Sequence, residues 1–187
     1  MEIEQQCQIA KQASSAMATL STADKNGVIL AMADALDGAH DAIFLANQSD
    51  IQMGKSAGLS SALLDRLRLT PDRLTGVANS LRAIAALPDP VGTVTTGFRR
   101  PNGLNIIQQS VPIGVLGIIY EARPNVTVDA IGLAIKSGNA LVLRGSQSAT
   151  HTNRALVEVL MAVAAPRVPD GSVQLLHDTS RDGVSVL

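Results

Sequence analysis

Residues 118–153 constrain the fold of this chain more than any other segment. A short apolar run leads into a polar Arg-Pro-Asn corner, a helical pattern follows, and a second apolar run ends in Arg-Gly-Ser. Continuous apolar strands joined through a helix are typical of parallel β-α-β units whose sheet is covered on both faces. In open sheets of this kind, ligands bind in the crevice at the carboxyl ends of the strands. The polar corners after the two strands are therefore the first place to look for a functional site.

Three apolar runs, at residues 115–120, 140–143 and 173–176, alternate with helical patterns at 127–136 and 149–165. We expect one parallel sheet with right-handed crossovers. A sheet that stops one element after its third strand leaves an apolar edge uncovered. We therefore expect the chain to be the front part of a longer polypeptide; the alternative is a complete small domain that a partner closes.

The first 92 residues have a helical pattern, because apolar residues recur at three- and four-residue steps. Ser21 and Asp24 predict a capping box at the start of the second helix. A third helix is expected at residues 39–57, with an interruption near Asn47.

Further along, Thr70 followed by Pro71 predicts the start of another helix. Two β-rich runs, at 93–98 and 104–111, flank a Pro-Asn-Gly turn and indicate a hairpin. Near the end of the chain, Ser180 is predicted to cap one more helix.

The charge balance excludes several classes of partner. Fifteen basic and sixteen acidic residues give a net charge of -1, so no basic field is available for nucleic acid or an anionic membrane. No apolar run has the length of a membrane span, and the N-terminus lacks the basic region of a signal peptide. Cys7, the single cysteine, cannot form an internal disulfide, which fits the cytoplasm. The three histidines show no metal-ligand spacing, so no metal site is expected.

The first polar corner holds two candidates for chemistry. Asn125 follows Pro124 near the start of a helix, where an amide donor can stabilise a developing oxyanion. On residue type alone, a helix cap is the favoured role of Asn125. Arg123 is suited to bidentate binding of a carboxylate or phosphate, although the local sequence favours an ion pair with Glu121.

The second corner reads Arg144-Gly145-Ser146-Gln147. Gly145 allows a close approach of the backbone to a ligand, and Arg144 is suited to a phosphate. An ordinary strand-to-helix turn with a solvated arginine is an equal alternative. No GxGxxG fingerprint follows any strand, so a standard dinucleotide loop is absent.

Cys7 and His151 are weaker candidates. Cys7 lies on the apolar stripe of the first helix, where a structural thiol is expected. His151, at the start of the helix after the second corner, has no defined partner and is expected at the surface.

VPIGVLGIIYEARPNVTVDA followed by KSGNALVLRGSQSATHTN resembles the gamma-glutamyl phosphate reductases, a family within the aldehyde dehydrogenase superfamily. LLDRLRLTPDRL and the RPNGL hairpin are similar to the same family, so the resemblance covers essentially the whole chain. It implies an α/β fold with N-terminal helices, a parallel Rossmann-like sheet and a β-hairpin from the oligomerisation domain. The implied parts are the helical portion of the cofactor domain, the hairpin, and a βαβαβ portion that binds NADPH, at residues 1–92, 93–111 and 112–187.

The resemblance also implies an activity: NADPH-dependent reduction of L-glutamyl 5-phosphate to L-glutamate 5-semialdehyde, with phosphate release, in proline biosynthesis. In the family mechanism a cysteine thiolate attacks the acyl carbon, phosphate leaves, and a hydride reduces the thioester. That cysteine is expected in a catalytic domain beyond residue 187, and Cys7 does not match it. The chain alone is expected to be inactive, and the full-length protein is expected to form a homo-oligomer.

Individual roles carry over from the resemblance. Asn125 is similar to the amide of the oxyanion hole, and Arg123 is a candidate for binding the substrate. Arg144 stands where many relatives have a lysine on the adenosine ribose, and a neutral Gln147 beside it favours NADPH over NADH; the adenosine side would be lined by Gly145 and Ser146. The alternatives are another aldehyde or acyl-phosphate reductase of the superfamily, and a non-catalytic nucleotide-binding module.

Overall fold

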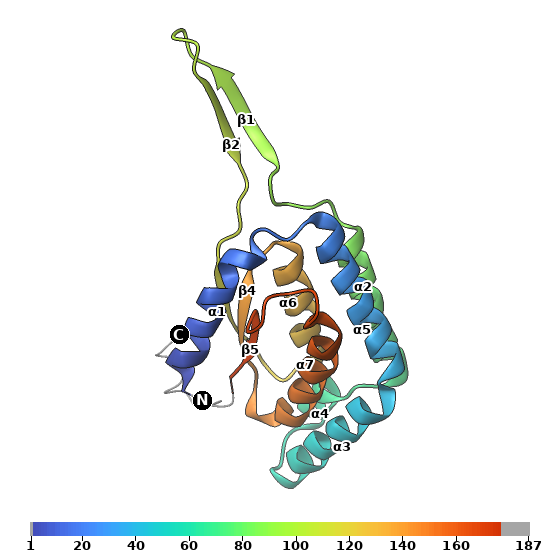
Figure 1. The fold of residues 1–187 in the computed structure, drawn as a ribbon. Helices are drawn as coiled ribbons and strands as arrows, with labels where there is room; N and C mark the ends of the chain where they lie inside the picture. The colour runs from blue at the N-terminus through green and yellow to red at the C-terminus, as the bar shows by residue number, and fades with distance from the viewer. Residues whose placement is uncertain (1, 177–187) are drawn as a thin grey trace.

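The computed structural model describes residues 2–176. Within this range, five helices come first, a β-hairpin follows, and three strands then alternate with helices (Figure 1). In chain order the elements are α1 (Ile3–Met17), α2 (Thr22–Gly38), α3 (His40–Ser56), α4 (Ser61–Leu67), α5 (Pro71–Ala86), β1 (Val94–Arg99), β2 (Asn105–Gln109), β3 (Val115–Ile119), α6 (Pro124–Lys136), β4 (Ala140–Arg144), the 3-10 helix η1 (Gln147–Ala149), α7 (Thr150–Ala164) and β5 (Val173–Leu175).

The body of the molecule is layered around a parallel sheet. β3, β4 and β5 pair in that order, with α1 on one face and α6 and α7 on the other (Figure 1). α2 and α5 pack against α6 and α7 from outside, so the main core lies between two layers of helices. β4, the central strand, is buried at its first four residues, as a strand covered on both faces requires. The expected α/β fold with a parallel sheet is confirmed.

The predicted helix starts at Ser21 and Thr70 are confirmed. The backbone N–H of Asp24 donates to Ser21 Oγ over 3.1 Å, and the N–H of Arg73 donates to Thr70 Oγ1 over 3.2 Å. Pro71 occupies the first turn of α5, where its missing N–H costs nothing. Local chemistry therefore decides where α2 and α5 begin.

The predicted interruption of the third helix at Asn47 is wrong. α3 is continuous, and Asn47 is buried within it. Its amide donates to Leu67 O over 2.9 Å and to Thr152 Oγ1 over 3.2 Å, and its oxygen accepts from Leu69 N over 2.8 Å. A polar residue thus stays inside the helix because distant groups satisfy its amide.

Element bounds otherwise lie close to those predicted. The three parallel strands agree within one residue, whereas the helix expected at 127–136 starts three residues earlier, because Pro124 occupies its first turn. The short helix α4 is an addition to the predicted set. Ser180 lies outside the described residues.

A buried ion pair joins α2 to the segment before the hairpin. Lys25 Nζ lies 2.6 Å from Asp89 Oδ2, and its side chain is 2% exposed. Thr22 Oγ1 also donates to Asp89, over 2.6 Å, and Val91 N donates over 3.0 Å. Burial alone would raise the pKa of Asp89, but the hydrogen bonds from Lys25, Thr22 and Val91 together hold that pKa below its usual value.

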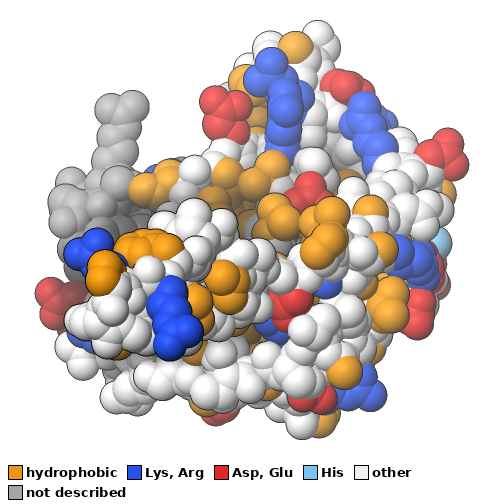
Figure 2. Space-filling view, turned by 90° about the horizontal axis from the view of Figure 1, so that it is seen from above, with side chains coloured by type: hydrophobic (Ala, Val, Ile, Leu, Met, Phe, Trp, Pro, Cys, Tyr) orange, Lys and Arg blue, Asp and Glu red, His pale blue; other side chains and the backbone are white. Residues whose placement is uncertain are grey.

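The hairpin formed by β1 and β2 projects away from the layered body (Figure 1). All its strand residues are exposed, including Phe98 and Ile107, and Gly103 supports the turn with a φ of +87°. On the face seen from above, hydrophobic side chains are interspersed with acidic and basic ones (Figure 2). Among residues 2–176, no helix has the length and apolar character of a membrane span.

Candidate functional site at the carboxyl edge of the sheet

The two polar corners lie at the same edge of the sheet. Ile119, at the end of β3, pairs with Arg144, at the end of β4. Tyr120 N then donates a 3.1 Å hydrogen bond to Arg144 O, so the chain leaves both strands at the same level. The residues that follow β3 and β4 therefore surround one crevice, as expected for a parallel sheet.

A partly buried chain of hydrogen bonds holds this edge together. Tyr120 Oη lies 2.7 Å from Thr127 Oγ1, which donates to Asn153 Oδ1 over 2.9 Å. The chain connects the end of β3 to the first turns of α6 and α7. Burial raises the pKa of the Tyr120 phenol, although the contact with Thr127 partly offsets that effect.

Gly145 has a packing role that the sequence did not indicate. It is buried, and a Cβ at this position would collide with the Asn153 amide and lie 3.1 Å from Tyr120 Oη. Glycine is therefore required here by the internal packing of Tyr120 and Asn153 against the backbone.

One cavity, which we call the Arg144 pocket, opens between the sheet edge and α4. Its volume is about 550 Å³. The sheet side contributes Ile119, Tyr120, Arg144, Ser146 and Ser148, and the α4 side contributes Leu59, Leu63 and Arg66. Guanidinium and hydroxyl groups thus line the pocket together with apolar side chains and with Glu121, whose carboxylate pairs with Arg66. The guanidinium and hydroxyl groups are suited to a phosphate-bearing ligand.

Gln147 is exposed and lines an adjoining cavity of about 470 Å³ rather than the Arg144 pocket. The two cavities share Leu59, Ser146 and Ser148. The Arg-Gly-Ser-Gln segment therefore separates two neighbouring spaces at one edge of the sheet.

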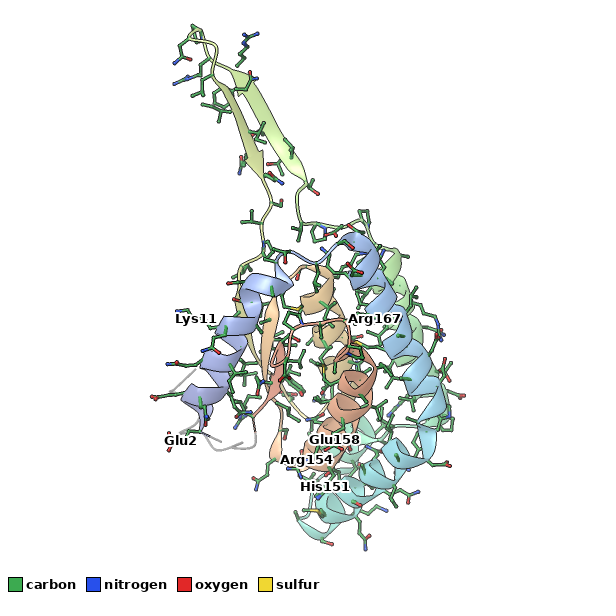
Figure 3. All side chains as sticks on the ribbon, in the orientation of Figure 1. Glu2, Lys11, His151, Arg154, Glu158 and Arg167 are labelled. Atoms are coloured by element: carbon green, nitrogen blue, oxygen red, sulfur yellow. The ribbon has the colours of Figure 1, made fainter. Side chains whose placement is uncertain are left out.

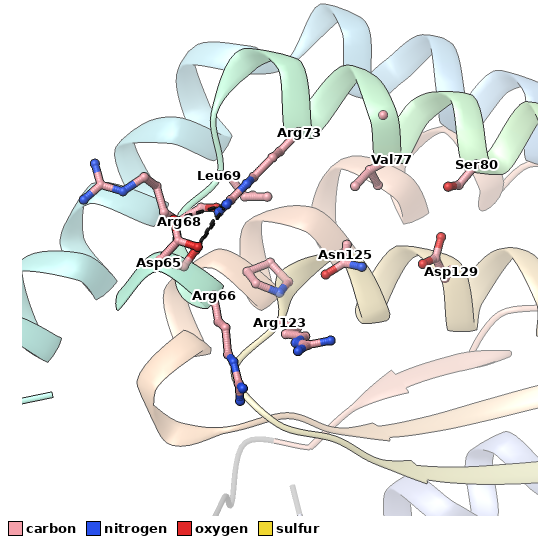
Figure 4. A pocket seen from close by; sticks show the side chains of 12 residues that line it. Asp65, Arg66, Arg68, Leu69, Arg73, Val77, Ser80, Arg123, Asn125 and Asp129 are labelled. Carbon is pink, nitrogen blue, oxygen red and sulfur yellow. Dashed lines mark hydrogen bonds and ion pairs between the residues drawn. The ribbon is translucent and has the colours of Figure 1, made fainter. Parts of the chain in front are cut away.

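A second cavity, the Asn125 pocket, lies between α5 and the first turns of α6 (Figure 4). Its volume is about 420 Å³. Asn125 and Asp129 project into it from α6, opposite Val77 and Ser80 of α5 (Figure 4). Arg123 and Arg66 line both this pocket and the Arg144 pocket, so they form the wall between the two.

The simpler roles considered for the first corner are wrong. Arg123, not Asn125, is the N-cap of α6, and Asn125 lies in the first turn without a side-chain capping bond. Glu121 forms its ion pair with Arg66, over 3.7 Å, instead of with Arg123. Both Asn125 and Arg123 are exposed in the pockets. Neither residue has the structural role that local sequence favoured.

Asp50 of α3 is a structural residue that sequence reasoning missed. Its side chain is 2% exposed and accepts hydrogen bonds from His151 N over 3.2 Å, Thr152 N over 2.7 Å and Thr152 Oγ1 over 2.6 Å. His151 Nδ1 lies 2.8 Å from the same carboxylate. His151 and Arg154 lie at the end of α7 near α3, whereas Arg167 lies near the other end (Figure 3). Asp50 thus caps α7 from a distant helix, a role that no local motif indicates.

Cys7 lies on α1 and packs beside the apolar residues Ala10, Ala140, Val142 and Leu176. The thiol is partly buried. It belongs to the face of the sheet that α1 covers, and it lines neither the Arg144 pocket nor the Asn125 pocket. A structural role for Cys7 fits this placement.

Comparison with known proteins identifies the class. A model of the aldehyde dehydrogenase family matches residues 1–187, which is the whole chain. The chain therefore belongs to the aldehyde dehydrogenase family.

Several similar members of this family are gamma-glutamyl phosphate reductases. Gamma-glutamyl phosphate reductase of Moorella thermoacetica is 50% identical over 188 residues, which cover 100% of this chain and 45% of that protein. The crystal structure of the Thermotoga maritima gamma-glutamyl phosphate reductase matches with a TM-score of 0.94 and 34% identity, over 97% of this chain and 44% of that chain. The Saccharomyces cerevisiae enzyme gives a TM-score of 0.90 and 33% identity, with 97% and 47% covered. The chain spans less than half the length of each of these relatives.

Proposed function

We propose that this chain provides the cofactor-binding part and one wall of the substrate site of a gamma-glutamyl phosphate reductase. The reaction is the reduction of L-glutamyl 5-phosphate to L-glutamate 5-semialdehyde, with NADPH as reductant and phosphate as leaving group. The observation that carries the proposal is the pair of adjoining pockets that share Arg123 and Arg66, because a reductase needs cofactor and acyl substrate side by side. The 50% identity to the Moorella enzyme supports the choice of substrate.

The Arg144 pocket fits the phosphate-bearing part of NADPH. Arg144 offers a guanidinium, and Ser146 and Ser148 offer hydroxyl groups. Gly145 lies between Arg144 and Ser146 in the turn that follows β4. Gln147 next to them is uncharged, so nothing at that position repels a ribose 2'-phosphate. When bound, the cofactor supplies the hydride.

The Asn125 pocket fits the acyl phosphate. The Asn125 amide makes no capping bond, so it is available to donate to the oxygen that gains charge as the acyl carbon is attacked. Arg123 at the wall between the pockets is suited to hold an anionic group of the substrate. We assign the attacking thiolate to a part of the full protein outside residues 1–187, because Cys7 lies on the face that α1 covers.

The hairpin is proposed to mediate assembly of a homo-oligomer. Its strands extend beyond the body, and Phe98, Leu104 and Ile107 are more than half exposed at 54%, 57% and 60%. Apolar side chains on a projecting hairpin are best stabilised by a second copy of the protein.

The reverse reaction tests the proposal. The protein is expressed from its full natural reading frame and assayed with L-glutamate 5-semialdehyde, NADP⁺ and inorganic phosphate. We expect NADPH formation that requires both the amino-acid aldehyde and phosphate. Equal rates with a simple aldehyde would point to another aldehyde dehydrogenase. Cofactor binding without any turnover would point to a non-catalytic nucleotide-binding module.

A further inference from the structure

The Asn125 pocket has a polar stripe on each of its two helical walls. On α5 the stripe consists of Arg73 and Ser80, with Gly76 between them on the wall of the pocket. On α6 it consists of Asn125 and Asp129, one turn apart. Figure 4 shows these α6 side chains directed toward α5. A carboxylate and an amide therefore face a space enclosed by a second helix.

Asp129 has no partner for its charge among the residues that the structure describes. Its Oδ1 is shielded from solvent and accepts no hydrogen bond. A buried acceptor without a hydrogen bond destabilises a fold, and native proteins rarely contain one unless it has a functional role. Burial also raises the pKa of the Asp129 carboxyl, in keeping with a site that a cationic group would complete.

Gly76 keeps the same space open. It lies in the middle of α5, where glycine weakens a helix relative to alanine. A Cβ at this position would meet nothing within 4 Å, so internal packing does not require the glycine. Gly132 contrasts with it, because a Cβ there would lie 2.7 Å from Leu81 Cδ2. Helix packing accounts for Gly132, whereas the volume of the pocket accounts for Gly76.

Positive charge lies nearer the other end of the pocket. Arg73 is fully engaged there, because it binds both carboxylate oxygens of Asp65 over 3.1 Å and the carbonyl of Arg68 over 2.9 Å. Arg123 is exposed and has no ion pair with any described residue. The pocket thus carries a free carboxylate at one end and an available guanidinium at the other, which suits a zwitterion.

We propose that Asp129 is a specificity residue that binds the α-ammonium group of an α-amino-acid substrate in the Asn125 pocket. This inference rests on the proposed function and extends it to the part of the substrate that does not react. Residues four apart on a helix have Cβ atoms about 5–6 Å apart. In glutamyl phosphate, four bonds separate the acyl carbon from the α-nitrogen, which is about 5 Å at ordinary bond lengths. Asn125 at the acyl oxygen and Asp129 at the ammonium group therefore match the length of the substrate.

Binding of two matched ligands tests this assignment. L-Glutamate and glutarate differ only in the α-ammonium group, and isothermal titration calorimetry measures their affinities for the protein expressed from its full natural reading frame. We expect about ten-fold tighter binding of L-glutamate. Asp129→Asn should remove that preference because it weakens the binding of L-glutamate. The affinity for glutarate should stay unchanged or increase. Asp170→Asn, an exposed control far from the pocket, should retain the preference.

A pocket-filling variant provides a second test. Gly76→Leu should abolish binding of both ligands while the thermal unfolding temperature does not fall. Equal affinities of the wild-type protein for the two ligands, a preference that survives Asp129→Asn, or full binding by Gly76→Leu would each overturn the assignment. Failure of the proposed function is a separate result, namely the absence of phosphate-dependent NADP⁺ reduction in the activity assay.

Discussion

The backbone N–H of Tyr120 donates a 3.1 Å hydrogen bond to the carbonyl oxygen of Arg144. This is the last hydrogen bond between the β3 and β4 segments, and both strands end beside it. The helix that begins beyond Tyr120 and the loop that begins beyond Arg144 therefore start side by side. Two pockets that share Arg66 and Arg123 lie at this edge of the sheet.

Arg144→Glu should weaken the binding of NADPH much more than the binding of NADH. A carboxylate at this position would repel the 2'-phosphate, which only NADPH carries, and loss of one charge-assisted contact corresponds to about ten-fold or more in affinity. Fluorescence titration with each cofactor measures the effect. Lys11→Glu on α1, which makes the same charge change away from the Arg144 pocket, serves as the control. Equal losses of affinity for NADPH and NADH would show that Arg144 does not contact the 2'-phosphate.

If Asn125 donates to the oxyanion, as proposed, Asn125→Ala should lower turnover by the protein expressed from its full natural reading frame by on the order of 10²-fold. Because Asn125 makes no capping bond, the free energy of unfolding should change by less than about 0.5 kcal/mol. Steady-state kinetics and urea denaturation together measure both quantities. Unchanged turnover would show that Asn125 lines the pocket without a catalytic role.

Asp50→Ala should destabilise the fold by about 3 kcal/mol. The substitution removes the cap of α7 and leaves buried Thr152 without its acceptor, and hydrogen bonds to a charged group are worth about 1.5–3 kcal/mol. Urea denaturation measures the change, with Asp170→Ala as an exposed control. A loss no larger than that of the control would show that another group takes over the cap.

Asp89→Asn should reduce stability at neutral pH but not in strong acid. Since the folded state lowers the pKa of Asp89, its contribution is complete above the unfolded value of about 3.9 and declines as the pH falls through the folded value. The difference in unfolding free energy between wild type and variant should therefore be constant from pH 7 to about pH 5 and shrink below about pH 4. Denaturation at a series of pH values tests this. A difference that already closes near pH 6 would assign the effect to another group.

Two glycine substitutions should have opposite effects on stability. Gly76→Ala should stabilise the fold by about 0.5–1 kcal/mol, because a helix favours alanine and the added methyl group meets open space. Gly132→Ala should destabilise it, because the methyl group would press on Leu81 where α5 and α6 pack. Thermal unfolding of the two variants gives the comparison. The same sign of change in both would contradict the packing argument.

The sequence alone determined the order and kind of most elements. The cap residues Ser21 and Thr70 and the apolar strands carry their signals locally, since a cap or a strand depends on residues a few positions apart. The common edge of the two polar corners also followed from the sequence, because parallel strands joined by a helix must end on the same side.

Only the tertiary structure decided how side chains from distant segments meet. Asn47 remains inside α3 because Leu67 at the end of α4 and Thr152 of α7 accept hydrogen bonds from its amide, and Asp50 caps a helix about a hundred residues away. Asp129 became a candidate only when α5 enclosed the pocket that it lines. The physical reason is that hydrogen-bond satisfaction and enclosed volume depend on which surfaces pack together, and no local pattern records that packing.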